Sequence, residues 1–119
     1  MSRLLVVEDD DDLRFLYETT FARIGYEVVA APNTVEAMLH LTNGDFDAII
    51  LDLQMPDMPG QRVVEFARED VRLRHVPIIV VSANERWRAA VTALGVRAYL
   101  VKPVTMAQIV AQVADVLRG

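Results

Sequence analysis

The chain has 119 residues, is 53% hydrophobic and 24% charged, and carries a formal net charge of −5. This composition is too apolar for a disordered chain, and the negative charge argues against direct binding of nucleic acid. The absence of cysteine excludes disulfides, thiolate zinc sites and a cysteine nucleophile.

No apolar run approaches the length of about 20 residues that spans a bilayer. The N-terminus also lacks the apolar stretch of a signal peptide. We therefore expect a single cytoplasmic domain over residues 1–119 that does not enter a membrane.

Five short segments rich in Val, Ile, Leu and Ala are predicted to be β-strands. Runs of this kind, without polar alternation, indicate strands that are buried on both faces of a parallel sheet. The predicted strands cover residues 4–7, 27–31, 48–51, 78–81 and 98–101.

Segments with helical periodicity separate these strands. Apolar residues recur at steps of three and four over residues 13–24, which predicts an amphipathic helix that ends at Gly25. Asn33 and Thr105 each begin a segment with the spacing of a capping box. One helix is therefore expected over residues 34–41, and another from the cap at Thr105 to residue 117. Two more helices are predicted, one after Gly60 and one over residues 85–94.

Strands and helices thus alternate along the chain, starting with a strand and ending with a helix. Regular alternation of this kind predicts a doubly wound α/β domain, (βα)5, with a parallel sheet and helices on both of its faces. No linker, repeat or low-complexity tract interrupts the pattern.

Four of the predicted strands are followed by charged or polar side chains. The first strand leads to Glu8 and Asp9, the third to Asp52, the fourth to Ser82 and the fifth to Lys102. Ligands of open parallel sheets bind outside the carboxyl ends of the strands, so these side chains are expected to converge. Carboxylates, a hydroxyl and an ammonium group are suited to metal-dependent phosphoryl transfer.

Each of these residues also has a simpler explanation. The acids at positions 9–12 could cap the first helix and favour its positive dipole end, and capping is the favoured explanation for positions 10–12. For Glu8 and Asp9 both explanations stay open. Asp52 could bond to backbone in a turn, while Ser82 and Lys102 could be ordinary strand-end and surface residues. The expected convergence at one edge favours a shared site.

Four segments together resemble the receiver domain of two-component response regulators, and the resemblance extends over essentially the whole chain. The matching segments are residues 6–10, 52–60, 81–83 and 99–103. The resemblance implies a five-stranded sheet of order 2-1-3-4-5, as in chemotaxis regulators. It also implies that Asp52 accepts a phosphoryl group in the presence of Mg²⁺.

The resemblance implies ligands for the metal ion. Asp9 and Asp52 match the acids that bind Mg²⁺ directly, and Glu8 matches the neighbour that acts through a water. Gln54 matches a position at which the backbone carbonyl is the ligand.

The resemblance also implies residues that recognise the phosphoryl group and report its presence. Ser82 and Lys102 match the hydroxyl and the ammonium that contact phosphoryl oxygens. Tyr99 matches the aromatic residue that rotates inward when Ser82 moves. Pro103 matches a position where the preceding peptide bond is usually cis, which would direct Lys102 into the site.

The implied partners are a sensor histidine kinase or phosphotransfer protein as donor, and a downstream protein or output domain as target. A homodimer that forms on phosphorylation is a further expectation, and the only chemistry expected is the chain's own phosphorylation and dephosphorylation. The segment between Ser82 and Gly95 is shorter than in many receivers, so the loop or first turn of the fourth helix should be shortened. This departure puts the usual signalling surface in doubt.

Two other classes of function fit parts of the pattern. A phosphatase-like or topoisomerase-primase-like Mg²⁺ enzyme would also place acids at strand ends, but such enzymes typically carry Asp-x-Asp where this chain has Asp52-Leu53-Gln54. An interaction module that works without phosphorylation is disfavoured because every expected site position is filled.

Overall fold

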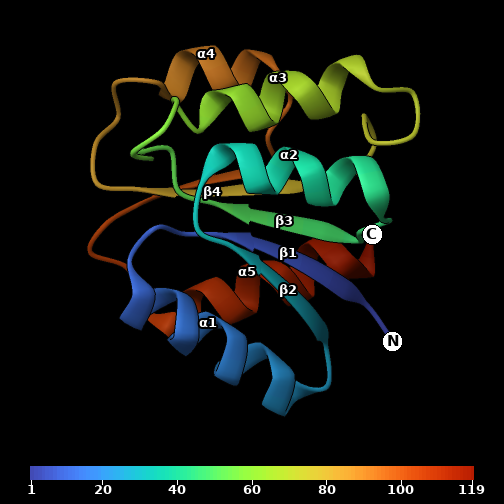
Figure 1. Ribbon diagram of the computed structural model, residues 1–119. Helices are drawn as coiled ribbons and strands as arrows, with labels where there is room; N and C mark the ends of the chain where they lie inside the picture. Colours follow the sequence, from blue (N-terminus) through green and yellow to red (C-terminus); the bar gives the residue numbers. More distant parts are fainter.

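The computed structural model describes residues 1–119, and five β-strands form one sheet in it. The strands are β1 (Arg3–Val7), β2 (Glu27–Ala31), β3 (Ala48–Leu51), β4 (Ile78–Ser82) and β5 (Ala98–Val101). All neighbouring strands are parallel, and their order is β2-β1-β3-β4-β5 (Figure 1). The predicted parallel sheet and its strand order are confirmed.

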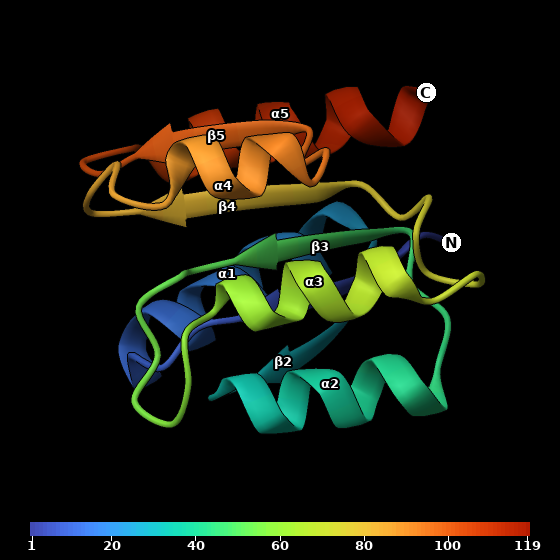
Figure 2. The same ribbon diagram turned by 90° about the horizontal axis from the view of Figure 1, so that it is seen from above.

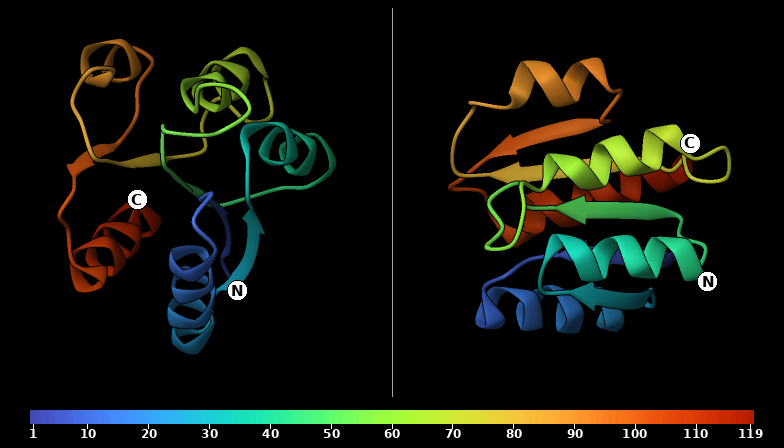
Figure 3. Two further views of the ribbon diagram at one scale, coloured as in Figure 1. Left: turned by 60° about the vertical axis from the view of Figure 1, so that its left-hand side comes forward. Right: turned by 45° about the horizontal axis from the view of Figure 1, so that its top comes forward.

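Five helices connect and cover the strands. They are α1 (Asp11–Ile24), α2 (Thr34–Asn43), α3 (Gln61–Glu69), α4 (Arg88–Ala93) and α5 (Met106–Arg118). Helices α1 and α5 lie on one face of the sheet, and α2, α3 and α4 lie on the other (Figure 3). None of these helices combines the length and hydrophobicity needed to span a membrane.

The buried strands divide the core into two layers. Because successive side chains of a strand point to opposite faces, Leu4 and Val6 of β1 pack on the side of α1 and α5, whereas Leu5 and Val7 pack on the side of α2 and α3. All four side chains are almost completely inaccessible to solvent. Burial on both faces explains why this strand shows no polar alternation in the sequence.

Helix ends follow the capping residues in the sequence. The carboxylate of Asp10 accepts a hydrogen bond from the amide of Leu13 (2.8 Å), so α1 begins at Asp11, earlier than the predicted residue 13. Gly25 ends α1 in the left-handed conformation (φ 114°), as predicted. Thr105 and Gln108 form a complete capping box at the start of α5.

Helix α4 comprises only six residues, so it is shorter than the predicted segment 85–94. The side chain of Asn84 accepts a hydrogen bond from the amide of Arg86 (3.0 Å), which gives this backbone a local alternative to the helix. No side chain caps the helix at Trp87. Ala90, in the middle of the helix, is exposed. The shortening therefore affects the first turn of the helix.

The end of α4 is held by one arginine of α3. The guanidinium of Arg68 donates hydrogen bonds to the carbonyls of Leu94 (2.8 Å) and Gly95 (3.3 Å), and to those of Arg74 (3.0 Å) and Val76 (3.1 Å). Burial lowers the pKa of Arg68, but an arginine remains charged at any physiological pH. This single side chain thus ties α4 to the loop between α3 and β4.

We expect Arg68→Ala to destabilise the fold by about 2–3 kcal/mol, because four carbonyl groups lose a charged donor. Unfolding in urea measures the difference. Arg62→Ala on the same helix is the matched control, since the Arg62 side chain is exposed and forms only a long ion pair with Glu65 (3.8 Å). Equal losses for both variants would show that Arg68 does not hold α4 in place.

Candidate functional site

Three carboxylates meet where β1 and β3 end. The arrowheads of the strands point to the same edge of the sheet (Figure 2), and the loops that leave this edge carry Glu8, Asp9 and Asp52. One carboxylate oxygen from each of these residues lies within 4.8 Å of the others. The structure therefore brings together the three acids that the strand endings suggested.

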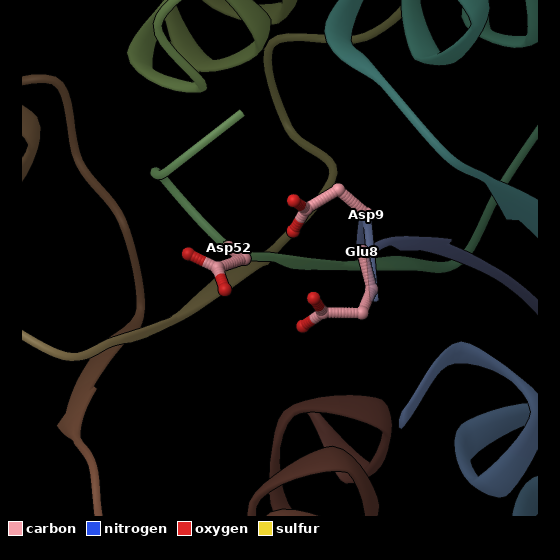
Figure 4. A group of neighbouring side chains, drawn as sticks. All are labelled: Glu8, Asp9 and Asp52. Atoms are coloured by element: carbon pink, nitrogen blue, oxygen red, sulfur yellow. The ribbon is translucent and has the colours of Figure 1, made fainter. Parts of the chain in front are cut away.

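The three acids differ in exposure and direction. Glu8 and Asp52 are 2% and 6% exposed, whereas Asp9 lies at the surface. In Figure 4 the carboxylates of all three residues extend to the same side of the strand ends, and that of Glu8 lies on the side of α1 and α5. The cluster is thus open to solvent on one side and enclosed on the other.

The acidic run after β1 divides into different roles. Asp10 caps α1, as favoured from the sequence. Asp11 pairs with Arg14 (2.5 Å). The same Arg14 guanidinium donates to the backbone carbonyls of Glu8 (3.0 Å) and Asp9 (3.3 Å). These bonds fix the turn between β1 and α1, and Asp9 belongs to the carboxylate cluster rather than to the helix cap.

Lys102 supplies the positive charge of the site. Its ammonium donates a hydrogen bond to Oδ2 of Asp52 (3.0 Å) and lies 3.9 Å from Oε1 of Glu8. The other oxygen of Asp52, Oδ1, accepts a hydrogen bond from the amide of Gln54 (2.9 Å). The peptide bond between Lys102 and Pro103 is cis.

The charges and the burial of the site shift two pKa values. Burial raises the pKa of Glu8 to about 7, and the negative charge of Asp52 adds to this rise, while Lys102 and the amide of Asp10 oppose it. Burial alone would lower the pKa of Lys102, but its hydrogen bond to Asp52 and the surrounding carboxylates raise it. One lysine cannot neutralise three carboxylates, so a divalent cation would be favourable here.

The loop between β3 and α3 is folded tightly behind Asp52. A Cβ atom on Gly60 would lie 2.6 Å from the carbonyl oxygen of Asp52 and 2.7 Å from Cα of Leu53, so only glycine fits there. Gln54 and Asp9 both line a groove of about 600 Å³ beside the cluster. Gln54 therefore lies next to the acids.

Asp57 anchors this loop to α2. Its carboxylate accepts hydrogen bonds from the amides of Thr34 (3.2 Å) and Val35 (3.0 Å). Asp57 is exposed; its slight desolvation alone would raise its pKa, but backbone amides, led by that of Val35, lower it. Asp57 lies within the matching segment 52–60, but the sequence alone assigned no role to it or to Arg14. The partners of Asp57 are distant in the sequence, so no local spacing could have identified its role. Arg14 follows Asp10 by one helical turn, and this spacing could have shown that its side chain lies near the start of α1.

Ser82 and Tyr99 lie on the neighbouring strands β4 and β5. Ser82, the last residue of β4, is completely buried, and its hydroxyl has no hydrogen-bond partner. The hydroxyl of Tyr99 donates to the carbonyl of Asn84 (2.6 Å), and the guanidinium of Arg88 lies 5.4 Å from the centre of its ring. Tyr99 therefore contacts the loop that follows Ser82.

The chain matches the family model of the response regulator receiver domain over residues 4–114. It is 37% identical over 121 residues to the chemotaxis protein CheY1 of Helicobacter pylori, and the match covers 98% of this chain and 97% of that protein.

Two solved structures extend the comparison to three dimensions. The response regulator TrrA from Thermotoga maritima in complex with Mg²⁺ and BeF has a TM-score of 0.86 and 28% identity, over 98% of this chain and 99% of that one. The receiver domain of a sensor histidine kinase from Pseudomonas aeruginosa, with a magnesium ion coordinated in its active site cleft, has a TM-score of 0.89 and 25% identity, over 99% and 98%. The chain therefore belongs to the family of response regulator receiver domains.

Proposed function

We propose that this receiver domain, comprising all of residues 1–119, accepts a phosphoryl group on Asp52 in a Mg²⁺-dependent phosphorelay. The observation that carries the proposal is the carboxylate cluster of Glu8, Asp9 and Asp52 beside the ammonium of Lys102. This arrangement provides a nucleophilic oxygen, ligands for a cation and a positive charge at one place. Phosphoryl transfer depends mainly on such positioning and charge compensation.

The residues present fit a magnesium ion. Mg²⁺ prefers oxygen ligands and keeps several waters, so one or two carboxylates are enough to hold it. Asp9 and Asp52 would bind it directly, with the carbonyl of Gln54 as a third protein ligand and Glu8 acting through a water. When bound, the ion offsets negative charge on the acids and on the phosphoryl oxygens.

The side chains around Asp52 suit the transfer step. An oxygen of Asp52 forms the new bond to phosphorus while the bond from phosphorus to a histidine nitrogen of the donor breaks. Lys102 already contacts Asp52, so it can pair with a phosphoryl oxygen there. The unpartnered hydroxyl of Ser82 can donate to another phosphoryl oxygen. Water later attacks the acyl phosphate and breaks its bond to Asp52, which releases inorganic phosphate and regenerates the carboxylate.

The phosphorylated state would be reported through Ser82 and Tyr99. Movement of Ser82 toward the phosphoryl group displaces the loop that Tyr99 contacts through the carbonyl of Asn84. Under this proposal the donor is a histidine kinase or phosphotransfer protein in the cytoplasm. The recipient of the signal is a target protein, an output domain or a second copy of the chain.

We expect incubation with acetyl phosphate and Mg²⁺ to add one phosphoryl group to the protein, because Asp52 is the acceptor. Intact-mass spectrometry measures the addition, and Asp52→Asn should abolish it. Asp12→Asn is the matched control, since Asp12 is an exposed acid in the first turn of α1, and it should be labelled like the wild type. Full labelling of Asp52→Asn would refute the assignment.

Two neighbouring acids should respond oppositely to truncation. Asp9→Ala removes a metal ligand and relieves repulsion, so we expect Mg²⁺ affinity to fall at least about tenfold, while the metal-free melting temperature stays unchanged or rises. Asp10→Ala removes the cap of α1 and should cost about 1 kcal/mol of stability with little change in Mg²⁺ affinity. Titration calorimetry and thermal unfolding separate the two effects. The reverse pattern would make Asp9 the structural residue.

The metal-free protein should lose stability as the pH rises. Burial raises the pKa of Glu8 from 4.5 in the unfolded chain to about 7 in the fold, so protonated Glu8 favours the folded state. This contribution is fully present below pH 4.5 and is lost as the pH rises through about 7. Glu8→Gln should flatten the dependence of the melting temperature on pH across this window. A slope unchanged by Glu8→Gln would show that another group causes it.

A further inference from the structure

Glu8 and Asp9 are consecutive residues, yet the carboxylates of both reach one cluster. Side chains of consecutive residues in a strand point to opposite faces of the sheet, so a continued β1 strand could not direct both toward the same place. One oxygen of each nevertheless lies within 4.8 Å of the other and of Asp52, and β1 ends at Val7. The backbone therefore bends directly after β1, and this bend decides whether the two acids can share a cation.

The bend has few backbone hydrogen bonds of its own. The amide of Glu8 donates to the carbonyl of Ala31 (3.0 Å), which continues the pairing with β2 for one residue beyond β1. The amide of Asp10 donates to Oε2 of Glu8 (3.1 Å). No backbone amide donates to the carbonyl of Glu8 or to that of Asp9. Because backbone carbonyls are strong acceptors, the bend depends on a side chain to bind these two.

Arg14, in the first turn of α1, donates to both carbonyls. Its Nη1 lies 3.0 Å from the carbonyl oxygen of Glu8 and 3.3 Å from that of Asp9. Its Nη2 pairs with Asp11 (2.5 Å), which orients the guanidinium. The side chain of Arg14 is only 19% exposed, so water competes little for these bonds. The planar fork of a guanidinium can make all three contacts at once, whereas a lysine ammonium is a compact point charge.

The guanidinium of Arg14 binds main-chain oxygens, so it leaves the carboxylate oxygens of the cluster free. Lys102, in contrast, donates directly to Oδ2 of Asp52. The positive charge of Arg14 by itself would repel a bound cation. Groups that hold metal ligands in place typically raise the affinity for the metal. Positioning and charge therefore predict opposite changes in cation affinity when Arg14 is removed.

We propose that Arg14 is a positioning residue of the cation site: by bridging the carbonyls of Glu8 and Asp9, it holds the bend that turns two consecutive carboxylates toward one divalent cation. The inference rests on the proposed function, in which this cation is Mg²⁺. Arg14 acts through the main chain of the two acids and contacts neither the cation nor the phosphoryl group.

Arg14→Lys tests the inference because it keeps the charge and removes the fork. We expect the Mg²⁺ dissociation constant to rise about three- to tenfold, since one ammonium cannot bridge both carbonyls in the same way. Titration calorimetry measures the change. Arg14→Ala should also bind Mg²⁺ more weakly, although it removes a repelling charge.

Arg72→Lys is the matched control. Arg72 likewise donates to two backbone carbonyls, those of Leu41 and Gly44, and pairs with an aspartate, Asp45 (2.7 Å). These partners precede β3, so they lie at the opposite edge of the sheet from the acidic cluster. Thermal unfolding should show a loss of stability in both lysine variants, but Arg72→Lys should bind Mg²⁺ like the wild type.

A double-mutant cycle shows whether Arg14 acts through the acids. In an Asp9→Ala background, where one of the positioned carboxylates is absent, Arg14→Lys should weaken Mg²⁺ binding less than in the wild type, whereas independent effects multiply. Multiplying effects, unchanged or tighter binding by Arg14→Lys, tighter binding by Arg14→Ala, or an equal loss in Arg72→Lys would each overturn the inference. The proposed function stands in all these cases if the wild type binds Mg²⁺ and is phosphorylated on Asp52. A wild type that does neither would overturn the proposed function and this inference with it.

Discussion

Three carboxylates share the carboxyl edge of the sheet with a single lysine, and the rest of the site depends on this excess of negative charge. Glu8 and Asp52 are buried, so water screens their repulsion poorly. Lys102 donates a hydrogen bond to Asp52 and lies near Glu8. Its single positive charge cannot balance the three negative charges of Glu8, Asp9 and Asp52. The site is therefore arranged to favour a divalent cation or a proton, and the raised pKa of Glu8 is one consequence.

Holding like charges together requires a rigid frame. The strands β1, β3 and β4 are buried on both faces and set the positions at which Glu8, Asp52 and Ser82 leave the sheet. Two contacts outside the sheet fix the loops that follow. Arg14 binds the carbonyls of the β1–α1 turn, and Asp57 attaches the β3–α3 loop to the start of α2. Burial of apolar strands thus compensates for repulsion at their ends.

The part of the molecule next to Ser82 is less firmly held. Helix α4 has six residues and no side-chain cap at its start, while Arg68 holds its end. Trp87, before the first residue of α4, packs against the core and under the guanidinium of Arg86 at 5.1 Å. Within the proposed function, this asymmetry means that a change at Ser82 would displace the start of α4 more easily than its end.

The sequence by itself determined the alternation of strands and helices, the capped helix starts and the acids at the strand ends, because each depends on spacing between nearby residues. Their convergence followed from the rule that parallel strands end at one edge. Only the tertiary structure decided where α4 begins, that Asp9 joins the carboxylate cluster, and that Asp57 and Arg68 contact distant parts of the chain. These outcomes depend on packing between segments that are far apart in sequence, where no local spacing records which partner a side chain meets.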